Sequence, residues 1–172
     1  TLHTNDAPST VARLRYMEVE PYLISSALNG VVAQRLARTL CGSCETTYYA
    51  DDALLETEGL THLRGRALRR GEGCQRCHDS GFAGRLGVYE VLEVTGSLRR
   101  MIYRDAPTHK IRQAFVDGGG KTLRDEGIEH ALAGKTSLEE VLRVTRSDDS
   151  ASPPVAPKTE TDPAETLRED AA

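Results

Sequence analysis

The chain has 172 residues with 22 basic and 26 acidic side chains, a net charge of −4, and its length leaves room for one ordinary domain or a modest domain and a tail. Residues 1–146 hold 20 basic and 19 acidic side chains, so they lack the positive surplus that marks a nucleic-acid-binding protein. No run approaches the ~18 consecutive apolar residues of a membrane-spanning helix, and no secretory signal pattern is visible.

Two short helices and a strand are predicted in the first 40 residues. A helix begins near Pro8, because proline is favoured in a first helical turn and apolar residues then recur at helical spacing. A second helix covers 22–28 and ends near an Asn-Gly pair. Residues 31–40 are ambiguous, but their β-branched start and alternating pattern favour a strand that leads to Cys41.

The four cysteines of the chain form two Cys-x-x-Cys pairs, separated by 29 residues: Cys41, Cys44, Cys74 and Cys77. A two-residue spacer lets the backbone turn so that both thiolates face one ion, and two such pairs complete a tetrahedral shell of the kind that selects zinc. Two disulfides or four unrelated thiols are the alternative. Four thiolates leave no open position for water, which favours a structural ion. His62 and His78 are potential substitute ligands, and surface histidines are the simpler interpretation.

A small β-rich element is expected around the cysteines. Residues 53–60 predict a short helix between the two pairs, and an arginine-rich stretch follows it. Three glycines after Cys77 predict a turn, and the alternation over 88–94 predicts a strand. Zinc would hold together an element that is too small for a core of its own.

The last third of the chain before the acidic tail is predicted to form short amphipathic helices, most simply packed as a bundle. They cover 97–104 and 107–116, and two more begin at Thr122 and Ser137. The last two carry capping-box patterns, with an acidic residue three positions after the hydroxyl. Residues 147–172 hold seven acidic residues and four of the seven prolines, which predicts a disordered acidic tail.

No catalytic set can be assembled from the sequence. Two Gly-Lys-Thr strings, at 120–122 and 134–136, resemble part of a phosphate loop. That loop needs a glycine five residues before its Gly-Lys, and Phe115 and Glu129 occupy those places. A loop between helices and a helix end are therefore the better interpretations. A Gly-x-Ser-x-Gly elbow and a His-Glu-x-x-His helix are also absent from the sequence.

Six strings occur in a fixed order: TLHTNDA (1–7), EPYLISSALN (20–29), GVVAQRLARTLC (30–41), GCQRCHDSGFAGRLGVYE (73–90), KTLRDEG (121–127) and TSLEEVLRVT (136–145). Together they resemble the C-terminal part of the secretion ATPases that power type II secretion and type IV pilus assembly, in the form that carries a tetracysteine element. The resemblance covers nearly the whole chain before the acidic tail.

This resemblance implies an α/β fold in four parts. Residues 1–40 would end a RecA-like P-loop NTPase core, and 41–77 would form the tetracysteine zinc insertion. Residues 78–146 would hold a β-turn exit and the terminal helical bundle, and 147–172 the tail. RecA-type sheets are parallel, so this piece would own only their last strands, with an exposed edge and an uncovered apolar face. We therefore expect the chain to behave poorly in isolation.

The resemblance also implies a function. The parent protein would be a cytoplasmic hexameric motor at the inner membrane, bound to secretion or pilus platform proteins and not directly to nucleic acid. It would use ATP and Mg²⁺ through a phosphate loop and acidic boxes expected before Thr1, so this chain is not expected to hydrolyse ATP alone. His3 matches a position that the family places near the nucleotide; a histidine at a strand end is the alternative.

Two other classes of protein stay open. A free-standing zinc ribbon that binds nucleic acid or protein is favoured by six arginines between 64 and 85, but few aromatic residues accompany them. A chaperone-type zinc element is the third interpretation, although the spacing after Cys77 departs from its repeat. Arg35 and Arg38 are interpreted as solvated strand arginines, with a phosphate or interface role as the alternative.

Overall fold

A computed structural model describes residue 2 and residues 4–146 of the chain. His3 and the predicted acidic tail at 147–172 lie outside these described residues. The described part is a mixed α/β structure with two antiparallel strand pairs and seven α-helices. None of these helices is both long enough and apolar enough to cross a membrane.

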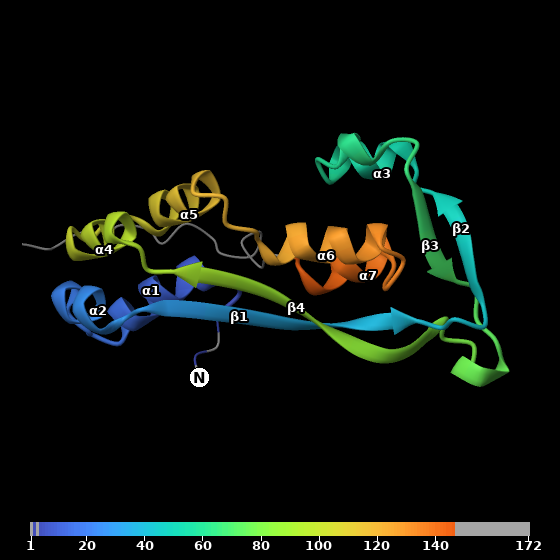
Figure 1. The fold of residues 1–172 in the computed structure, drawn as a ribbon, viewed down its shortest axis with the longest axis horizontal. Helices are drawn as coiled ribbons and strands as arrows, with labels where there is room; N and C mark the ends of the chain where they lie inside the picture. The colour runs from blue at the N-terminus through green and yellow to red at the C-terminus, as the bar shows by residue number, and fades with distance from the viewer. Residues whose placement is uncertain (1, 3, 147–172) are drawn as a thin grey trace, which may run out of the picture.

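A long ribbon runs through the molecule. It consists of β1 (Gly30–Leu40) and β4 (Phe82–Glu93), which pair antiparallel along most of their length (Figure 1). Their register is interrupted between Arg38 and Leu40, close to the first cysteine. The strand predicted over 31–40 is therefore confirmed.

Of the three glycines after Cys77, only Gly81 lies in the predicted turn, where residues 78–81 bend the chain and its φ is 75°. The strand predicted over 88–94 begins earlier, at Phe82, so Gly84 and Gly87 lie inside it. Glycine at position 87 leaves room for the neighbouring aromatic ring, because an added Cβ would overlap the Tyr89 side chain. Gly87 therefore makes space on the ribbon, whereas Gly84 has a left-handed backbone with a φ of 88°.

A short ribbon stands across the far end of the long one (Figure 1). Its strands are β2 (Glu45–Tyr49) and β3 (Ala67–Gly71), which also pair antiparallel. Helix α3 (Asp52–Thr57) and the 3-10 turn η1 (Thr61–Leu63) connect the two strands. The β-rich element expected between the cysteine pairs is present, and the helix predicted over 53–60 is shorter than expected.

Both strand pairs are antiparallel, and the described residues contain no parallel pair. The parallel strands expected of a RecA-like core are therefore not seen in this part of the chain. Antiparallel pairs can leave one face of the sheet uncovered.

Four helices pack against one end of the long ribbon and share a first core with Leu92 and Val94. The side chains that the helices contribute include Val11, Ile24 and Ile102, each nearly inaccessible to solvent. These helices are α1 (Ala7–Tyr16), α2 (Pro21–Ala27), α4 (Gly96–Tyr103) and α5 (Thr108–Asp117).

The remaining helices, α6 (Leu123–Leu132) and α7 (Leu138–Val144), lie over the middle of the long ribbon (Figure 1). They share a second core with side chains of the short ribbon and its connection, such as Leu55 and Leu68. The four C-terminal helices thus divide between two cores and do not pack as the single bundle that the sequence suggested.

The capping predictions are confirmed in one case and half-confirmed in the other. At the start of α6 the Thr122 hydroxyl accepts from the Asp125 N–H at 3.2 Å, and Asp125 accepts from the Thr122 N–H at 3.0 Å. At the start of α7 the Ser137 hydroxyl accepts from the Glu140 N–H at 3.2 Å. The Glu140 carboxylate does not complete this box, because it is bonded to Arg38 on β1.

The face of the long ribbon opposite the first core carries apolar side chains that the described residues leave uncovered. Val32 and Val91 pair across the strands, and both are more than 60% exposed. Leu36 and Tyr89 lie on the same face and are also exposed. We call these four side chains the open face.

Candidate metal centre

The four cysteines lie at strand ends, where the two ribbons meet. Cys41 follows β1 and Cys44 precedes β2. Cys74 comes after β3, and Cys77 ends the 3-10 turn η2 (Gln75–Cys77) shortly before β4. The chain therefore leaves the long ribbon at one pair and returns to it at the other.

Each Cys-x-x-Cys pair forms a tight turn. The Cys44 N–H donates to the Cys41 carbonyl oxygen at 3.1 Å, and the Cys77 N–H donates to the Cys74 carbonyl oxygen at 3.1 Å. The two turns thus close with the same hydrogen bond at the same length. This is the local geometry that the spacing predicts.

The two turns bring all four sulfur atoms together. The Sγ atoms of Cys41 and Cys74 are 4.0 Å apart, those of Cys44 and Cys77 are 3.8 Å apart, and all four lie within 4.8 Å of one another. Four sulfurs at ~2.3 Å from one tetrahedral ion would be roughly 3.8 Å from each other. The donor set and its spacing therefore fit a zinc ion.

Hydrogen bonds and burial act differently on the individual thiols. Burial opposes ionisation of Cys77, but N–H groups of Cys74 and Gly81, at 3.2 and 3.3 Å from its sulfur, lower its pKa to about 6. Burial raises the pKa of Cys44 to about 12, and hydrogen bonds from the other thiols add to this shift. Four sulfurs this close do not all ionise unless a cation lies between them.

Two glycines allow the ribbons to cross beside the sulfurs. An added Cβ at Gly71 would overlap the carbonyl oxygen of Gly81, and Gly81 itself has a φ of 75°. The same carbonyl oxygen of Gly81 accepts a hydrogen bond from the Cys41 N–H at 3.0 Å. This crossing fixes the first cysteine turn against the return strand.

The other histidines and arginines singled out in the sequence take different places. His62 and His78 are exposed and do not join the sulfur group. Arg38 is not simply solvated, because its guanidinium pairs with Glu140 at 2.8 Å. Arg35 is bonded to the side chain of Asn5 at 3.1 Å. His3 is outside the described residues.

Glu90 is a buried carboxylate whose role the sequence did not reveal. Its two oxygens accept from the Ala7 N–H at 2.8 Å and from the Leu123 N–H at 3.1 Å. These are the first residues of α1 and α6, so one carboxylate serves two helix N-termini. Burial raises its pKa, against the effect of the two N–H groups. In the sequence Glu90 looks like an ordinary polar residue of an alternating strand.

Comparison with known proteins places this geometry in context. Residues 1–143 match the model of a family described as type II/IV secretion system protein. The chain is 39% identical over 148 residues to type II secretion system protein E of Pseudomonas aeruginosa. It is 41% identical over 146 residues to type II secretion system ATPase E of Vibrio cholerae, and 42% over 147 residues to type IV pilus assembly ATPase PilB of Thermus thermophilus.

The matches cover most of this chain but a minor part of its relatives. They include 86%, 85% and 84% of the chain for the three proteins in that order. The chain spans 29% of the length of the first two relatives and 16% of the third.

Proposed function

Because the chain belongs to the family of type II/IV secretion system proteins, we propose that it is the C-terminal portion of a motor ATPase that powers type II secretion or type IV pilus assembly. The observation that carries this proposal is the match over 1–143 to proteins named as secretion and pilus ATPases. The four gathered sulfurs support it independently, since they fit the tetracysteine form expected from the sequence.

In this proposal zinc has a structural role at Cys41, Cys44, Cys74 and Cys77. The ion joins the end of the long ribbon to the start of the short one, where the described side chains form no large core around the turns. Four thiolates fill its tetrahedral shell and leave no position for a reacting water. Zinc would thus contribute folding free energy rather than chemistry.

The chemistry of the motor would come from other parts of the parent protein. Phosphoryl transfer needs a phosphate-binding lysine and Mg²⁺ ligands, which the proposal assigns to a RecA-like core preceding this region. Residues 1–40 would border that core, with His3 near the nucleotide, and 41–77 would form the zinc insertion. We further propose a hexamer at the cytoplasmic side of the inner membrane, bound to platform proteins.

The metal assignment is tested by stoichiometry. We expect the purified chain to hold one zinc ion, measured by elemental analysis, and to lose it when any one of the four cysteines is replaced by serine. His78→Asn is the matched control, because asparagine tolerates the left-handed backbone at this position, φ 51°. It should keep its zinc. A serine variant that retained a full equivalent of zinc would contradict the four-sulfur site.

The motor assignment is tested in a chimera. The matched segment of the Vibrio cholerae ATPase E is replaced by residues 1–146 of this chain, and ATP turnover is measured against the unaltered relative. We expect the chimera to retain turnover, because 41% identity over this region predicts that the segment folds alike in both proteins. The same chimera with Cys41→Ser and Cys44→Ser should lose zinc and turnover together. A folded, zinc-loaded chimera without turnover would count against the proposal.

A further inference from the structure

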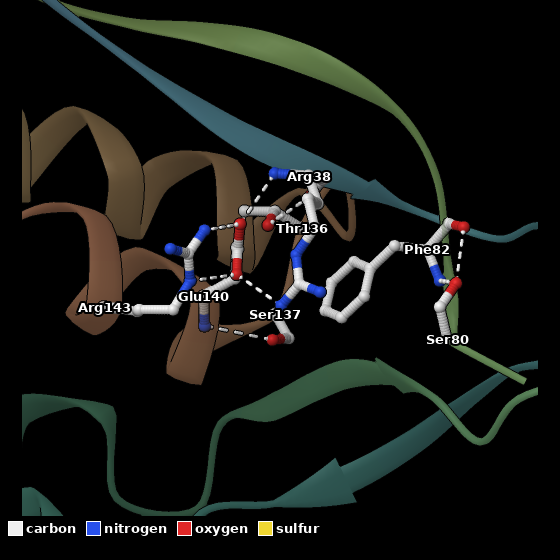
Figure 2. A network of polar contacts seen from close by, with 7 residues as sticks. All are labelled: Arg38, Ser80, Phe82, Thr136, Ser137, Glu140 and Arg143. Atoms are coloured by element: carbon white, nitrogen blue, oxygen red, sulfur yellow. Dashed lines mark hydrogen bonds and ion pairs between the residues drawn. The ribbon is translucent and has the colours of Figure 1, made fainter.

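Two side chains from the C-terminal helical region hold the end of β1 (Figure 2). The Glu140 carboxylate accepts a hydrogen bond from the Arg38 backbone N–H at 2.9 Å. The Thr136 hydroxyl donates to the Arg38 carbonyl oxygen at 2.8 Å. Both backbone groups of Arg38 are therefore bonded outside the β1–β4 pair, at the place where its register is interrupted.

The Arg38 guanidinium strengthens this attachment. It donates to Glu140 at 2.8 Å and lies over the Phe82 ring, 4.0 Å from its centre. Arg143 gives Glu140 two more hydrogen bonds, at 2.9 and 2.7 Å, and the Glu140 side chain has no exposed surface. We call Arg38, Thr136, Glu140 and Arg143 the Glu140 clamp.

The clamp is directly continuous with both cysteine turns. On one side, the Leu40 N–H donates at 3.0 Å to the loop between α6 and α7, and Cys41 comes next. On the other side, Phe82 follows Gly81, which bonds both turns. The Gly81 carbonyl accepts from Cys41 at 3.0 Å, and its N–H donates to the Cys77 sulfur at 3.3 Å.

We propose that the Glu140 clamp couples zinc binding at the four cysteines to the docking of α7 on β1, an inference that rests on the metal site proposed above. Zinc holds Cys41, and with it the end of β1, in the position where Arg38 meets Glu140. The coupling acts in both directions by linkage: docked α7 slows the loss of zinc, and bound zinc keeps α7 docked. Glu140 is thus a positioning residue for the metal ligand Cys41 and acts through Arg38.

Zinc release to a chromogenic chelator tests the first direction. We expect Glu140→Gln and Thr136→Val to release zinc about 10-fold faster than the unaltered chain, the lower end of the loss in metal affinity when a partner of a metal ligand is removed, because both side chains act on Cys41 through Arg38. Glu129→Gln is the matched control, because it makes the same carboxylate-to-amide change in an exposed pair with Lys121, outside the clamp and outside α7. Thr136→Ser restores the hydroxyl and should restore slow release.

Hydrogen exchange tests the opposite direction. Removal of zinc should lower the protection of the backbone amides of α7, while those of α4, which belongs to the first core, keep theirs. Exchange in α7 that is insensitive to zinc would overturn the coupling.

The outcomes separate the clamp from the metal site. If the clamp variants release zinc no faster than Glu129→Gln, the clamp is overturned while the zinc site stands. If the unaltered chain binds no zinc, the metal site and the clamp fall together.

Discussion

Glu140 is buried and bonded to two guanidinium groups, so its ionisation is tied to folding. Burial opposes its ionisation, but the hydrogen bonds from Arg143 and Arg38 outweigh this and lower its pKa to about 2, from an ordinary 4.5. A lowered pKa means that the folded state favours the carboxylate. The resulting stability is fully present above the ordinary pKa and is lost as the pH falls through the folded one.

The lowered pKa of Glu140 predicts how the stability of the Glu140→Gln variant depends on pH. The variant should lose about 3 kcal/mol of unfolding free energy at neutral pH, which is the linkage contribution of a carboxyl group whose pKa falls from 4.5 to about 2 on folding. The difference from the unaltered chain should shrink as the pH is lowered from ordinary carboxyl values towards 2. Urea unfolding at a series of pH values measures it.

Glu129→Gln is the matched control for that series. Its carboxylate pairs with Lys121 at the surface, where both side chains are more than half exposed. Such pairs contribute about 0–1 kcal/mol, so this variant should follow the unaltered chain closely. A constant difference between Glu140→Gln and the unaltered chain across the whole series would contradict the assignment of the pKa.

Among the helices, strands and turns, the sequence predicted those features whose partners lie only a few residues apart. The cysteine turns and the Thr122 cap follow from spacing alone, because their partners are three residues away. Strand β3 (Ala67–Gly71) lacks β-branched and aromatic residues, and only its pairing with β2 makes it a strand. Glu140 was expected to cap its own helix, but its carboxylate instead bonds Arg38, 102 positions away on β1. Pairings across that distance leave no periodic signal in one sequence.

The close crossing of the two ribbons at Gly71 predicts that a larger residue at this position destabilises the fold. Gly71→Ala should push the ribbons apart and cost about 1–3 kcal/mol, the usual penalty for extra atoms at a tight contact. Gly42→Ala is the control, because a Cβ at position 42 meets nothing within 4 Å. Chemical unfolding of both zinc-loaded variants compares them. Equal stability would show that the ribbons can separate without cost.

For the whole molecule, the open face is the feature with the clearest consequence. The described helices leave Val32, Leu36, Tyr89 and Val91 exposed together on one side of the long ribbon. Clustered apolar side chains of this kind drive association in water. An uncovered apolar face was expected from the sequence, although the strands that carry it are antiparallel rather than the parallel strands of the expected core.

We expect the isolated chain to self-associate, and Val91→Glu to reduce this association by introducing a charge on the open face. Val116→Glu is the control, because Val116 is also exposed but lies on α5. Sedimentation velocity over a range of concentrations measures both variants. A chain that stays monomeric at high concentration would contradict the prediction that the open face drives association.

Glu90 accepts hydrogen bonds from the first residues of α1 and α6. Because this carboxylate is buried, salt should have little effect on the strength of these hydrogen bonds. The surface ion pairs of this chain are exposed to solvent, where dissolved salt weakens electrostatic interactions with a screening length of about 8 Å at physiological ionic strength. Glu90 is 2% exposed and is bonded by backbone N–H groups at both oxygens. At high salt concentration the surface ion pairs would weaken, while the hydrogen bonds from α1 and α6 to the Glu90 carboxylate would persist.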